Sequence, residues 1–269
     1  MSDQKIIAII GGTIWGNRGA ESMLVTTIGK LRETFPGAKF NVFSYYPPKD
    51  RELITDENIN ILSCKPLSLA TRHFFGALIG AVSKAVGLDI PKGAFFEIAH
   101  ALDESDMLLD IGGITFSDGR EKYLPFNVLT IWPAMLLGTP VVKLAQALGP
   151  FENRLNRFLA KIFLSKCKHV FARGDRTAEF LADINLTDEQ ADTVSDIAFL
   201  YKPLYSLSVE NEPLAFELLK AIQGDRENGR KVIVCSPSIL VDNQSRKTGL
   251  DYTGFFIDLL KAESIIYWV

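Results

Sequence analysis

Short polar segments rich in glycine recur along the chain, and each follows directly after an apolar run. They occupy residues 16–21, 110–118, 146–150, 172–175 and 195–199. In open parallel α/β sheets, ligands bind in the crevice outside the carboxyl ends of the strands. If the apolar runs are strands, the five segments predict one wall of a ligand-binding cleft.

The first of these loops contains Gly16, Asn17 and Gly19 and leads into a predicted helix that carries Glu21. Glycines let the backbone pass close to a ligand, and a helix N-terminus favours an anion or polar hydroxyl groups. The loop matches neither the dinucleotide fingerprint nor the Walker motif. An ordinary strand-to-helix turn also needs glycine, and Glu21 suits either helix capping or binding of substrate hydroxyls, so both interpretations stay open.

The second loop begins with Gly112 and Gly113, which again allow close backbone approach. Asp118 and Glu121 then place carboxylates on the same loop. A carboxylate at a cleft edge suits general-base work or the binding of sugar hydroxyls. The Ser-Asp-Gly sequence around Asp118 is also typical of a simple turn, which is the more common role.

Three further polar side chains come after predicted strands, namely Gln146, Arg173 and Asp196. An arginine at a strand end can bind a carboxylate or phosphate with its planar fork. An ion pair of Arg173 with Asp175 or Glu179 is an equally good interpretation. Gln146 would offer an amide to the cleft, and Asp196 suits either a cleft position or a turn.

These segments must be positioned by alternating strands and helices. Apolar runs predict strands at 5–10, 39–44, 106–111, 140–145 and 169–173, and a last short strand and turn at 191–199. Helical spacing predicts helices at 21–35, 126–137, 153–165 and 175–182. Continuous apolar strands alternating with helices are typical of sheets buried on both faces. The pattern predicts an α/β fold, with a Rossmann-like, doubly wound parallel sheet.

A polar, irregular stretch at 203–213 predicts a domain boundary, dividing the chain into 1–205 and 206–269. The second part predicts a helix at 214–223, a strand at 231–235, a loop, a helix at 252–261 and an apolar end at 265–269. A self-standing doubly wound domain usually needs on the order of 100 residues. We therefore expect the second part to be an incomplete Rossmann-like half, with an exposed edge strand at 265–269 unless something covers it.

Composition excludes several classes of function. The net charge of −3 provides no general basic field for nucleic acid. The three cysteines are far apart, which argues against a disulfide framework and favours a reducing compartment. The three histidines are dispersed and offer no metal-ligand spacing, so no metal is expected. No secretory signal is recognisable at the N-terminus, and we expect a cytoplasmic location, with the inner face of the membrane left open.

An apolar stretch at 67–88 is interrupted by charges, and its uncharged run of 74–83 is too short to span a bilayer. Its length favours a partly buried helix. A helix lying on a membrane surface, close to a lipid-linked substrate, is the alternative.

Taken together and in this order, the five segments resemble the polysaccharide pyruvyl transferase family over roughly residues 5–240. The resemblance is carried by Gly-Asn-x-Gly-x-Glu, a strand ending in Gly-Gly with an Asp soon after, Gln-x-x-Gly-Pro-Phe, Ala-Arg-x-x-x-Thr and Ser-Asp-Ile-Ala-Phe. It implies two Rossmann-like halves facing a cleft, as in glycosyltransferases of the B type (GT-B). It also implies transfer of a pyruvyl group from phosphoenolpyruvate to a sugar of a surface or exported polysaccharide.

The resemblance assigns roles to residues. It implies Asp118 as the acceptor-side base and Arg173 as an anion-binding group. It implies that the substrate-binding residues are Gly16, Asn17, Gly19, Glu21, Gly112, Gly113, Gln146 and Asp196. The expected partners are phosphoenolpyruvate as donor substrate and a saccharide or lipid-linked saccharide as acceptor, without a cofactor. Peripheral membrane contact and homo-oligomerisation are left open.

The chain departs from the family's pattern in its second half. That half normally supplies a strand-end histidine and further basic residues, whereas here Ser236-Pro237-Ser238 resembles its start and no histidine follows. We expect a truncated second half, so that activity requires the missing part to be supplied. The alternatives are a non-catalytic remnant or sugar-binding module, and a nucleotide-sugar-dependent glycosyltransferase of the GT-B type.

Overall fold

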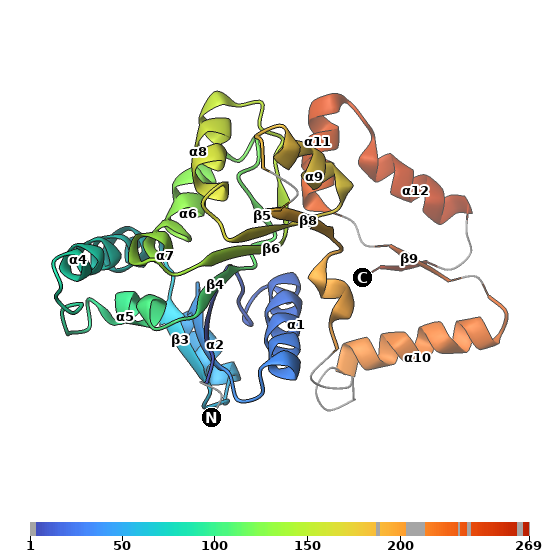
Figure 1. The fold of residues 1–269 in the computed structure, drawn as a ribbon. Coiled ribbons are helices and arrows are strands. Elements are labelled where there is room, and N and C mark those ends of the chain that lie inside the picture. The colour runs from blue at the N-terminus through green and yellow to red at the C-terminus, as the bar shows by residue number, and fades with distance from the viewer. Residues whose placement is uncertain are drawn as a thin grey trace. The chain divides into compact units, whose positions relative to one another are not determined.

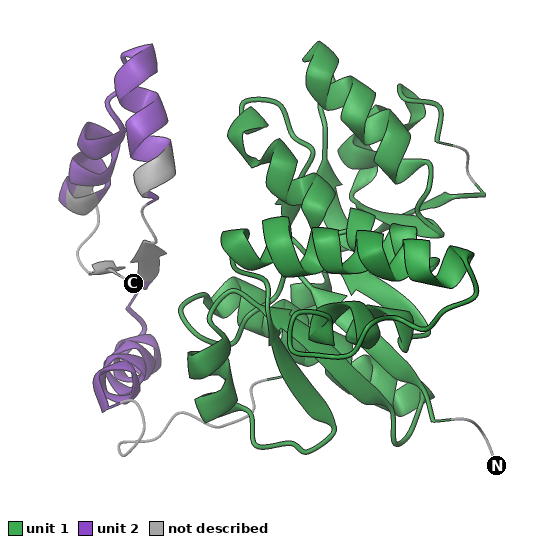
Figure 2. Cartoon of the chain, turned by 90° about the vertical axis from the view of Figure 1, so that its left-hand side faces the viewer, with its two compact units in different colours: residues 1–202 green, residues 203–269 purple. Residues whose placement is uncertain are grey.

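The computed structural model describes residues 4–186, 189–202, 213–230, 232–235, 238–262 and 266–268. They fall into two compact units, residues 1–202 and 203–269 (Figure 2). The boundary expected between residues 205 and 206 lies outside the described residues.

The first unit is built on an eight-stranded sheet in which every pairing is parallel. Its strands are β1 (Ile6–Ile10), β2 (Lys39–Ser44), β3 (Ile59–Ser63), β4 (Met107–Asp110), β5 (Ile114–Thr115), β6 (Val141–Leu148), β7 (His169–Arg173) and β8 (Ala191–Val194). The order is β3-β2-β1-β4-β6-β7-β8, with β5 beside β6 (Figure 1). The chain winds outward from β1 to β3, then returns to β4 and winds the other way. A topological switch point therefore lies between β1 and β4.

Helices cover both faces of this sheet. They are α1 (Arg18–Thr34), α2 (Pro47–Leu53), α3 (Pro66–Ser68), α4 (Phe74–Ala85), α5 (Glu97–Asp103), α6 (Leu124–Leu129), α7 (Trp132–Leu137), α8 (Arg154–Leu164) and α9 (Asp175–Ala182). The unit also contains the π-helix η1 (Leu69–His73) and the 3₁₀-helices η2 (Glu121–Tyr123) and η3 (Ile197–Leu200).

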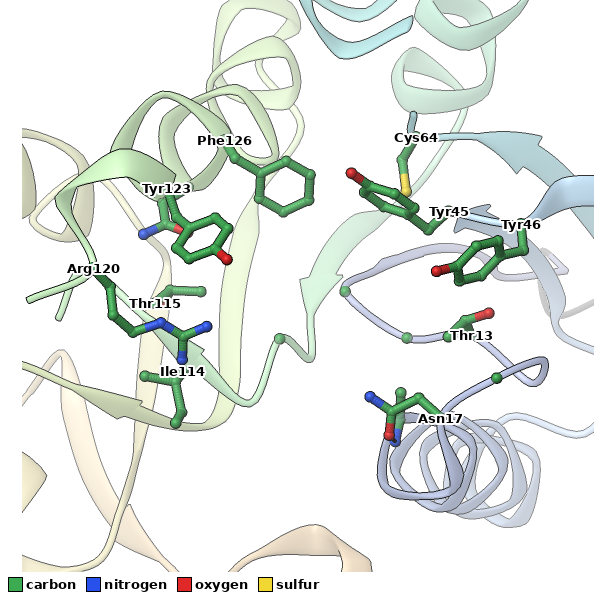
Figure 3. Close-up of a pocket in the computed structure, with 16 residues that line it drawn as sticks. Thr13, Asn17, Tyr45, Tyr46, Cys64, Ile114, Thr115, Arg120, Tyr123 and Phe126 are labelled. Atoms are coloured by element: carbon green, nitrogen blue, oxygen red, sulfur yellow. Dashed lines mark hydrogen bonds between the residues drawn. The ribbon is translucent and has the colours of Figure 1, made fainter. Parts of the chain in front are cut away.

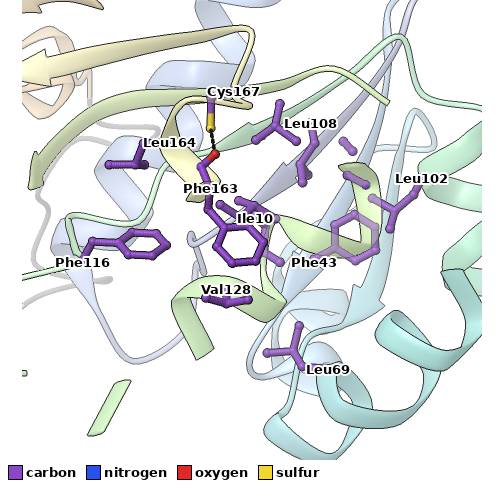
Figure 4. Close-up of a cluster of buried hydrophobic side chains, with 14 of the residues drawn as sticks. Ile10, Phe43, Leu69, Leu102, Leu108, Phe116, Val128, Phe163, Leu164 and Cys167 are labelled. Carbon is purple, nitrogen blue, oxygen red and sulfur yellow. Dashed lines mark hydrogen bonds between the residues drawn. The ribbon is translucent and has the colours of Figure 1, made fainter. Parts of the chain in front are cut away.

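The core is divided by the sheet into two clusters, as alternation along a strand requires. Ile7 and Ile9 of β1 lie in the cluster that includes Leu24 of α1. Ala8 and Ile10 point the other way, into the larger cluster under α4 to α8, part of which Figure 4 shows. This arrangement confirms the predicted doubly wound, Rossmann-like α/β fold.

One predicted element of this unit was wrong, and the elements α2, β3, α5 and β5 were not predicted. The single helix expected at 126–137 is two helices, α6 and α7, because Pro133 stands in the first turn of α7. Proline lacks an N–H and is tolerated only in the first turn of a helix. Strand β3 was not predicted, since its five residues follow a polar loop and include Asn60.

The second unit contains α10 (Pro213–Glu227), β9 (Ile233–Cys235), α11 (Ile239–Thr248), α12 (Tyr252–Ala262) and β10 (Ile266–Trp268). β9 and β10 pair in parallel. The loop expected before residue 252 is wrong, because α11 forms there and ends at Thr248, followed by Gly249 with φ of +75°. Residues 231, 236, 237, 265 and 269, on which predictions were also made, lie outside the described residues.

The stretch at 67–88 is helical and partly buried, as predicted: α3, η1 and α4 follow one another, and Gly76, Ala77 and Gly80 of α4 are buried. Among the described residues, no helix is long and apolar enough to cross a membrane.

His73, at the end of η1, predicts a pH dependence of stability. Its side chain is buried, and Nε2 lies 2.8 Å from the carbonyl oxygen of Ser63. Burial lowers the pKa of His73 from 6.5 to about 4. Between pH 6.5 and 4, His73 is therefore protonated in the unfolded chain but neutral in the folded chain. The free energy of unfolding consequently falls as the pH is lowered through this window.

We expect His73→Gln to remove about 3 kcal/mol of the loss in unfolding free energy between pH 7 and pH 4. Urea unfolding at both pH values measures it. The carboxylates contribute equally in the unchanged chain and in His73→Gln. The contribution of His73 is therefore the difference between the two proteins in how far the unfolding free energy falls from pH 7 to pH 4. An equal fall in the two proteins would contradict the assignment.

Candidate functional site

A pocket of about 490 Å³ opens at the carboxyl ends of β1 and β4, at the topological switch point (Figure 3). Ligands of doubly wound folds bind at this position. All its lining residues belong to the first unit: Gly11, Gly12, Thr13, Gly16, Asn17, Ala20, Tyr45, Tyr46, Cys64, Gly112, Ile114, Thr115, Arg120, Tyr123, Phe126 and Asn127.

The loop after β1 is fastened by the buried carboxylate of Asp50, a residue that no sequence motif selected. Asp50 accepts hydrogen bonds from the N–H groups of Ile14 (3.2 Å) and Trp15 (2.8 Å). It also accepts from the hydroxyls of Thr13 (2.9 Å) and Ser44 (2.6 Å). One buried carboxylate from α2 thus fixes the course of the whole loop.

The loops after β1 and β4 touch each other at glycine. Gly11 has φ of +91°, and a Cβ there would lie 2.4 Å from the backbone nitrogen of Gly112. No side chain fits in that space, so glycine is required for the two loops to meet. This contact joins the two sides of the pocket floor.

A buried network of charged and polar groups supports the loop after β4. Lys143 Nζ lies 2.7 Å from Asp110 Oδ2, with both side chains almost completely buried. Asp110 Oδ1 also accepts hydrogen bonds from the amide of Gln146 (2.8 Å) and from the N–H of Gly112 (2.9 Å). Thr115 donates to Gln146 Oε1 at 2.6 Å and accepts from Lys143 at 3.2 Å. The network holds Gly112 and Thr115 at the edge of the pocket.

An irregularity in β6 lets two of its residues serve this network together. In a regular strand, Lys143 and Gln146 would point to opposite faces of the sheet, because they are three residues apart. The register of β6 against β7 shifts between these two residues, and Ala145 has φ of +51°. Such a bulge redirects side chains. Both therefore reach Asp110, at the cost of a strained residue, a feature that often accompanies functional sites.

Aromatic side chains form much of the pocket wall. Tyr45 and Tyr46 follow β2, while Tyr123 and Phe126 come from η2 and α6. Trp15 supports Tyr46 with ring centroids 4.8 Å apart. Aromatic rings carrying a hydroxyl offer both an apolar face and a polar group. They therefore suit the C–H faces and hydroxyls of a sugar ring.

Arg120 is the only charged side chain among the described residues that line the pocket. Its guanidinium carbon lies 5.2 Å from the centre of the Tyr123 ring. Within the described part of the chain, no carboxylate forms an ion pair with it. Figure 3 shows the guanidinium on the wall opposite Asn17. An arginine so placed can bind a carboxylate or phosphate through paired N–H groups.

Cys64 lines the pocket without being a reactive thiol. Burial raises its pKa to about 12, and the sulfur donates a hydrogen bond to the carbonyl of Phe43 at 3.1 Å. Only the thiolate is an effective nucleophile, so Cys64 does not attack a substrate near neutral pH. Among the described residues, no group of three His, Cys, Asp or Glu side chains is arranged to hold a metal ion.

A family model described as polysaccharide pyruvyl transferase matches residues 17–258, which is most of the chain. The chain belongs to the polysaccharide pyruvyl transferase family. The match includes the pocket residues from Asn17 onward and extends into α12 of the second unit. It confirms the resemblance carried by the five strand-end segments.

No curated protein matches the chain. Among solved structures, UDP-GlcNAc 2-epimerase from Neisseria meningitidis bound to UDP-GlcNAc has 12% identity and a TM-score of 0.46, covering 99% of this chain and 72% of that one. A UDP-N-acetylglucosamine 2-epimerase has 14% identity and a TM-score of 0.43, covering 92% and 66%. An Anabaena protein in complex with UDP has 13% identity and a TM-score of 0.45, covering 87% and 53%. The chain thus spans between half and two thirds of the length of the last two.

Among the residues that the family pattern selected, Gly16, Asn17 and Gly112 line the pocket. Asn17 also caps α1, because its side chain accepts a hydrogen bond from the N–H of Ala20 at 3.1 Å. Gly19 and Glu21 are not among the lining residues. Glu21 is buried and pairs with Arg18 at 2.7 Å. The binding roles of these residues stay predictions.

Asp118, expected as a base, is engaged elsewhere. Its carboxylate accepts hydrogen bonds from the N–H groups of Glu152 (2.7 Å) and Asn153 (3.0 Å), and from the side-chain amide of Asn156 (2.6 Å). It fastens its loop to the start of α8 and does not line the pocket. These contacts favour a structural task, and its role as a base is untested.

Arg173 and Asp196 pair with each other at 2.7 Å. They line a separate recess of about 440 Å³ beside the ends of β7 and β8. The partner of Arg173 is therefore neither Asp175 nor Glu179, the two suggested by the sequence; Glu179 pairs with Arg176 instead. Gly113 adjoins this recess, since a Cβ there would lie 4.0 Å from Arg173 Nη1.

Gln146 lies beneath the pocket and not in it. Its side chain is completely buried, and its amide donates to both the carbonyl oxygen (2.6 Å) and the carboxylate (2.8 Å) of Asp110. These contacts favour a positioning role for Gln146, and its direct contact with a ligand stays a prediction. Sequence reasoning also missed Asp50, Lys143 and the aromatic wall, because none of them belongs to a glycine-rich segment.

Proposed function

We propose that the first unit provides the sugar-binding wall of a pyruvyl transferase that moves the pyruvyl group of phosphoenolpyruvate onto a surface or exported polysaccharide. The observation that carries this proposal is one pocket holding both an aromatic wall and the arginine Arg120, which has no carboxylate partner among the described residues. A sugar ring fits the aromatic wall. A carboxylate or phosphate of phosphoenolpyruvate fits the guanidinium.

The reaction sets the groups that the pocket must handle. Two sugar oxygens form bonds to C2 of the enolpyruvyl group while the bond from C2 to the phosphate oxygen breaks. One hydroxyl proton is balanced by the proton gained at the methylene carbon, and the other leaves with phosphate. Cationic groups must therefore hold carboxylate and departing phosphate, and acid and base groups must move protons.

In this proposal, Arg120 is a better candidate than Arg173 for binding the anionic groups of phosphoenolpyruvate. Arg173 is paired with Asp196 at 2.7 Å, so binding an anion there requires that pair to open. Arg120 needs no such step. The buried free thiols of Cys64 and Cys167 support a reducing, cytoplasmic compartment for the reaction.

We expect Arg120→Ala to weaken the affinity for phosphoenolpyruvate about 10- to 100-fold, the usual value of a charge-assisted hydrogen bond. Isothermal titration with phosphoenolpyruvate measures it on the full chain. Arg176→Ala is the matched control, because Arg176 is also exposed and also lies over an aromatic ring, that of Phe180 at 5.0 Å.

Further assays distinguish a pyruvyl transferase from a sugar-binding module and from a glycosyltransferase. Phosphate release from phosphoenolpyruvate with a saccharide acceptor tests turnover, and a saccharide alone tests a binding module. Stabilisation by a nucleotide sugar but not by phosphoenolpyruvate would point to a glycosyltransferase. Unchanged phosphoenolpyruvate affinity in Arg120→Ala would remove Arg120 from this role.

A further inference from the structure

Helix α4 presents its large apolar side chains to solvent. Phe75, Leu78, Ile79, Val82 and Val86 are all exposed, and the last two are 58% and 67% exposed. Their spacing follows one stripe along the helix. We call these five residues the α4 face. A surface helix of a soluble protein normally carries charged and polar residues in this position.

The packing of α4 does not account for this face. The buried side of the helix is formed by the small residues Gly76, Ala77 and Gly80. A Cβ at Gly80 would lie 3.2 Å from Leu137 and 3.3 Å from Ile90, so glycine lets α4 approach its neighbours closely. The core thus uses these small residues together with Phe74, whose ring packs on that of Trp132 with centroids 4.8 Å apart, and the other large residues are turned outward.

Basic residues outnumber acidic ones in the sequence segment that contains the α4 face, although the neighbouring helix α5 carries Glu97 and Asp103. Residues 65–96 contain four exposed Lys or Arg side chains and one acidic residue, Asp89, whereas the whole chain has 29 basic and 32 acidic residues. The basic residues are Lys65, Arg72, Lys84 and Lys92. Lys84 forms an ion pair with Asp103, and the other three precede or follow α4 in the sequence.

We propose that the α4 face docks on the surface of an anionic lipid bilayer. An apolar stripe flanked by basic residues is the pattern of helices that lie in the membrane interface. Basic side chains are attracted to anionic lipid headgroups over a Debye length. A soluble acidic partner could form ion pairs with the basic residues, but it would not explain the exposed phenylalanine and aliphatic side chains.

Docking there would bring the pocket close to the bilayer. Cys64, in the pocket wall, directly precedes the basic and apolar segment, and η1 contacts α6, which carries the pocket residue Phe126. Membrane docking does not depend on which ligand that pocket binds. Failure of the proposed function and failure of membrane docking are therefore separate results.

Vesicle flotation of the full chain tests the proposal. We expect the chain to float with vesicles of phosphatidylcholine and phosphatidylglycerol, less at high salt, and less with phosphatidylcholine alone. The double variant Ile79→Glu, Val82→Glu should reduce the bound fraction by about tenfold or more. The gentler pair Ile79→Ser, Val82→Ser should reduce it less.

The matched control is Leu155→Glu, Phe158→Glu on α8, where the two side chains are 57% and 61% exposed with the same three-residue spacing. It should float like the unchanged chain. Absence of flotation with anionic vesicles, or equal loss in both double variants, would overturn the proposal. Light scattering that shows self-association abolished only by the α4 variants, without vesicle binding, would assign the α4 face to a second copy of the chain instead.

Discussion

Replacing Lys143 by Met should destabilise the first unit by about 3 to 5 kcal/mol, because it leaves the carboxylate of Asp110 buried without its counter-charge. The two side chains are almost completely buried and lie 2.7 Å apart. Well-packed hydrophobic residues of the same volume could be as stable as this ion pair or more stable. Replacing only one of the two partners is costly, because the desolvation of the remaining charge is then no longer compensated.

The double variant Asp110→Asn, Lys143→Met provides the control. The asparagine side chain would keep an oxygen for the donors of Gly112 and Gln146, which now lie 2.9 and 2.8 Å from Asp110 Oδ1. We expect most of the lost stability to return. Guanidinium unfolding followed by tryptophan fluorescence measures the stability of both variants, and a cost below about 1 kcal/mol for Lys143→Met alone would contradict a stabilising role for the pair.

Replacing Asp50 by Ala should destabilise the first unit by about 3 kcal/mol or more and abolish ligand binding in the pocket. It removes the common acceptor of the Ile14 and Trp15 N–H groups and of two hydroxyls. Each buried donor left without a partner costs about 1 to 3 kcal/mol. The loop that includes Gly16 would also lose its fixed course.

Asp56→Ala is the matched control for this prediction. Asp56 is a partly exposed carboxylate nearby in the sequence, and it pairs with Arg32 at 2.5 Å. An ion pair exposed to this degree contributes little, about 1 kcal/mol or less. Urea unfolding and titration with phosphoenolpyruvate should separate the two variants clearly. Equal stability and equal affinity in both would contradict an anchoring role for Asp50.

Strand-end reasoning from the sequence located the pocket because it relies on a property of all parallel sheets. The carboxyl ends of β1 and β4 must meet at one edge, so the glycines that follow them must be neighbours. Gly16, Asn17 and Gly112 were selected in this way, and all three line the pocket. The same reasoning could not distinguish this pocket from the recess at Arg173, which lies at the same edge of the sheet.

The sequence could not predict the directions in which individual side chains of β6 point. Lys143 stands in an apolar run and Gln146 at its end, and a regular strand would send them to opposite faces. The bulge at Ala145 turns both toward Asp110, and no residue type there announces it. Tyr45 and Tyr46 were overlooked for a related reason, since a pair of tyrosines after a strand acquires meaning only when Tyr123 and Phe126 face it.

The amino-acid sequence by itself determined the α/β fold class of the first unit, its family and the sheet edge that holds the site, since these follow from apolar periodicity and strand-end motifs. The tertiary structure decided which charges are committed and which are available. Arg173 and Asp118 are engaged by Asp196 and by the start of α8, whereas Arg120 faces the pocket without a carboxylate partner among the described residues. Ion pairing depends on distance in space, and residues 23 or 35 positions apart in the sequence meet only when the strands and loops between them have folded.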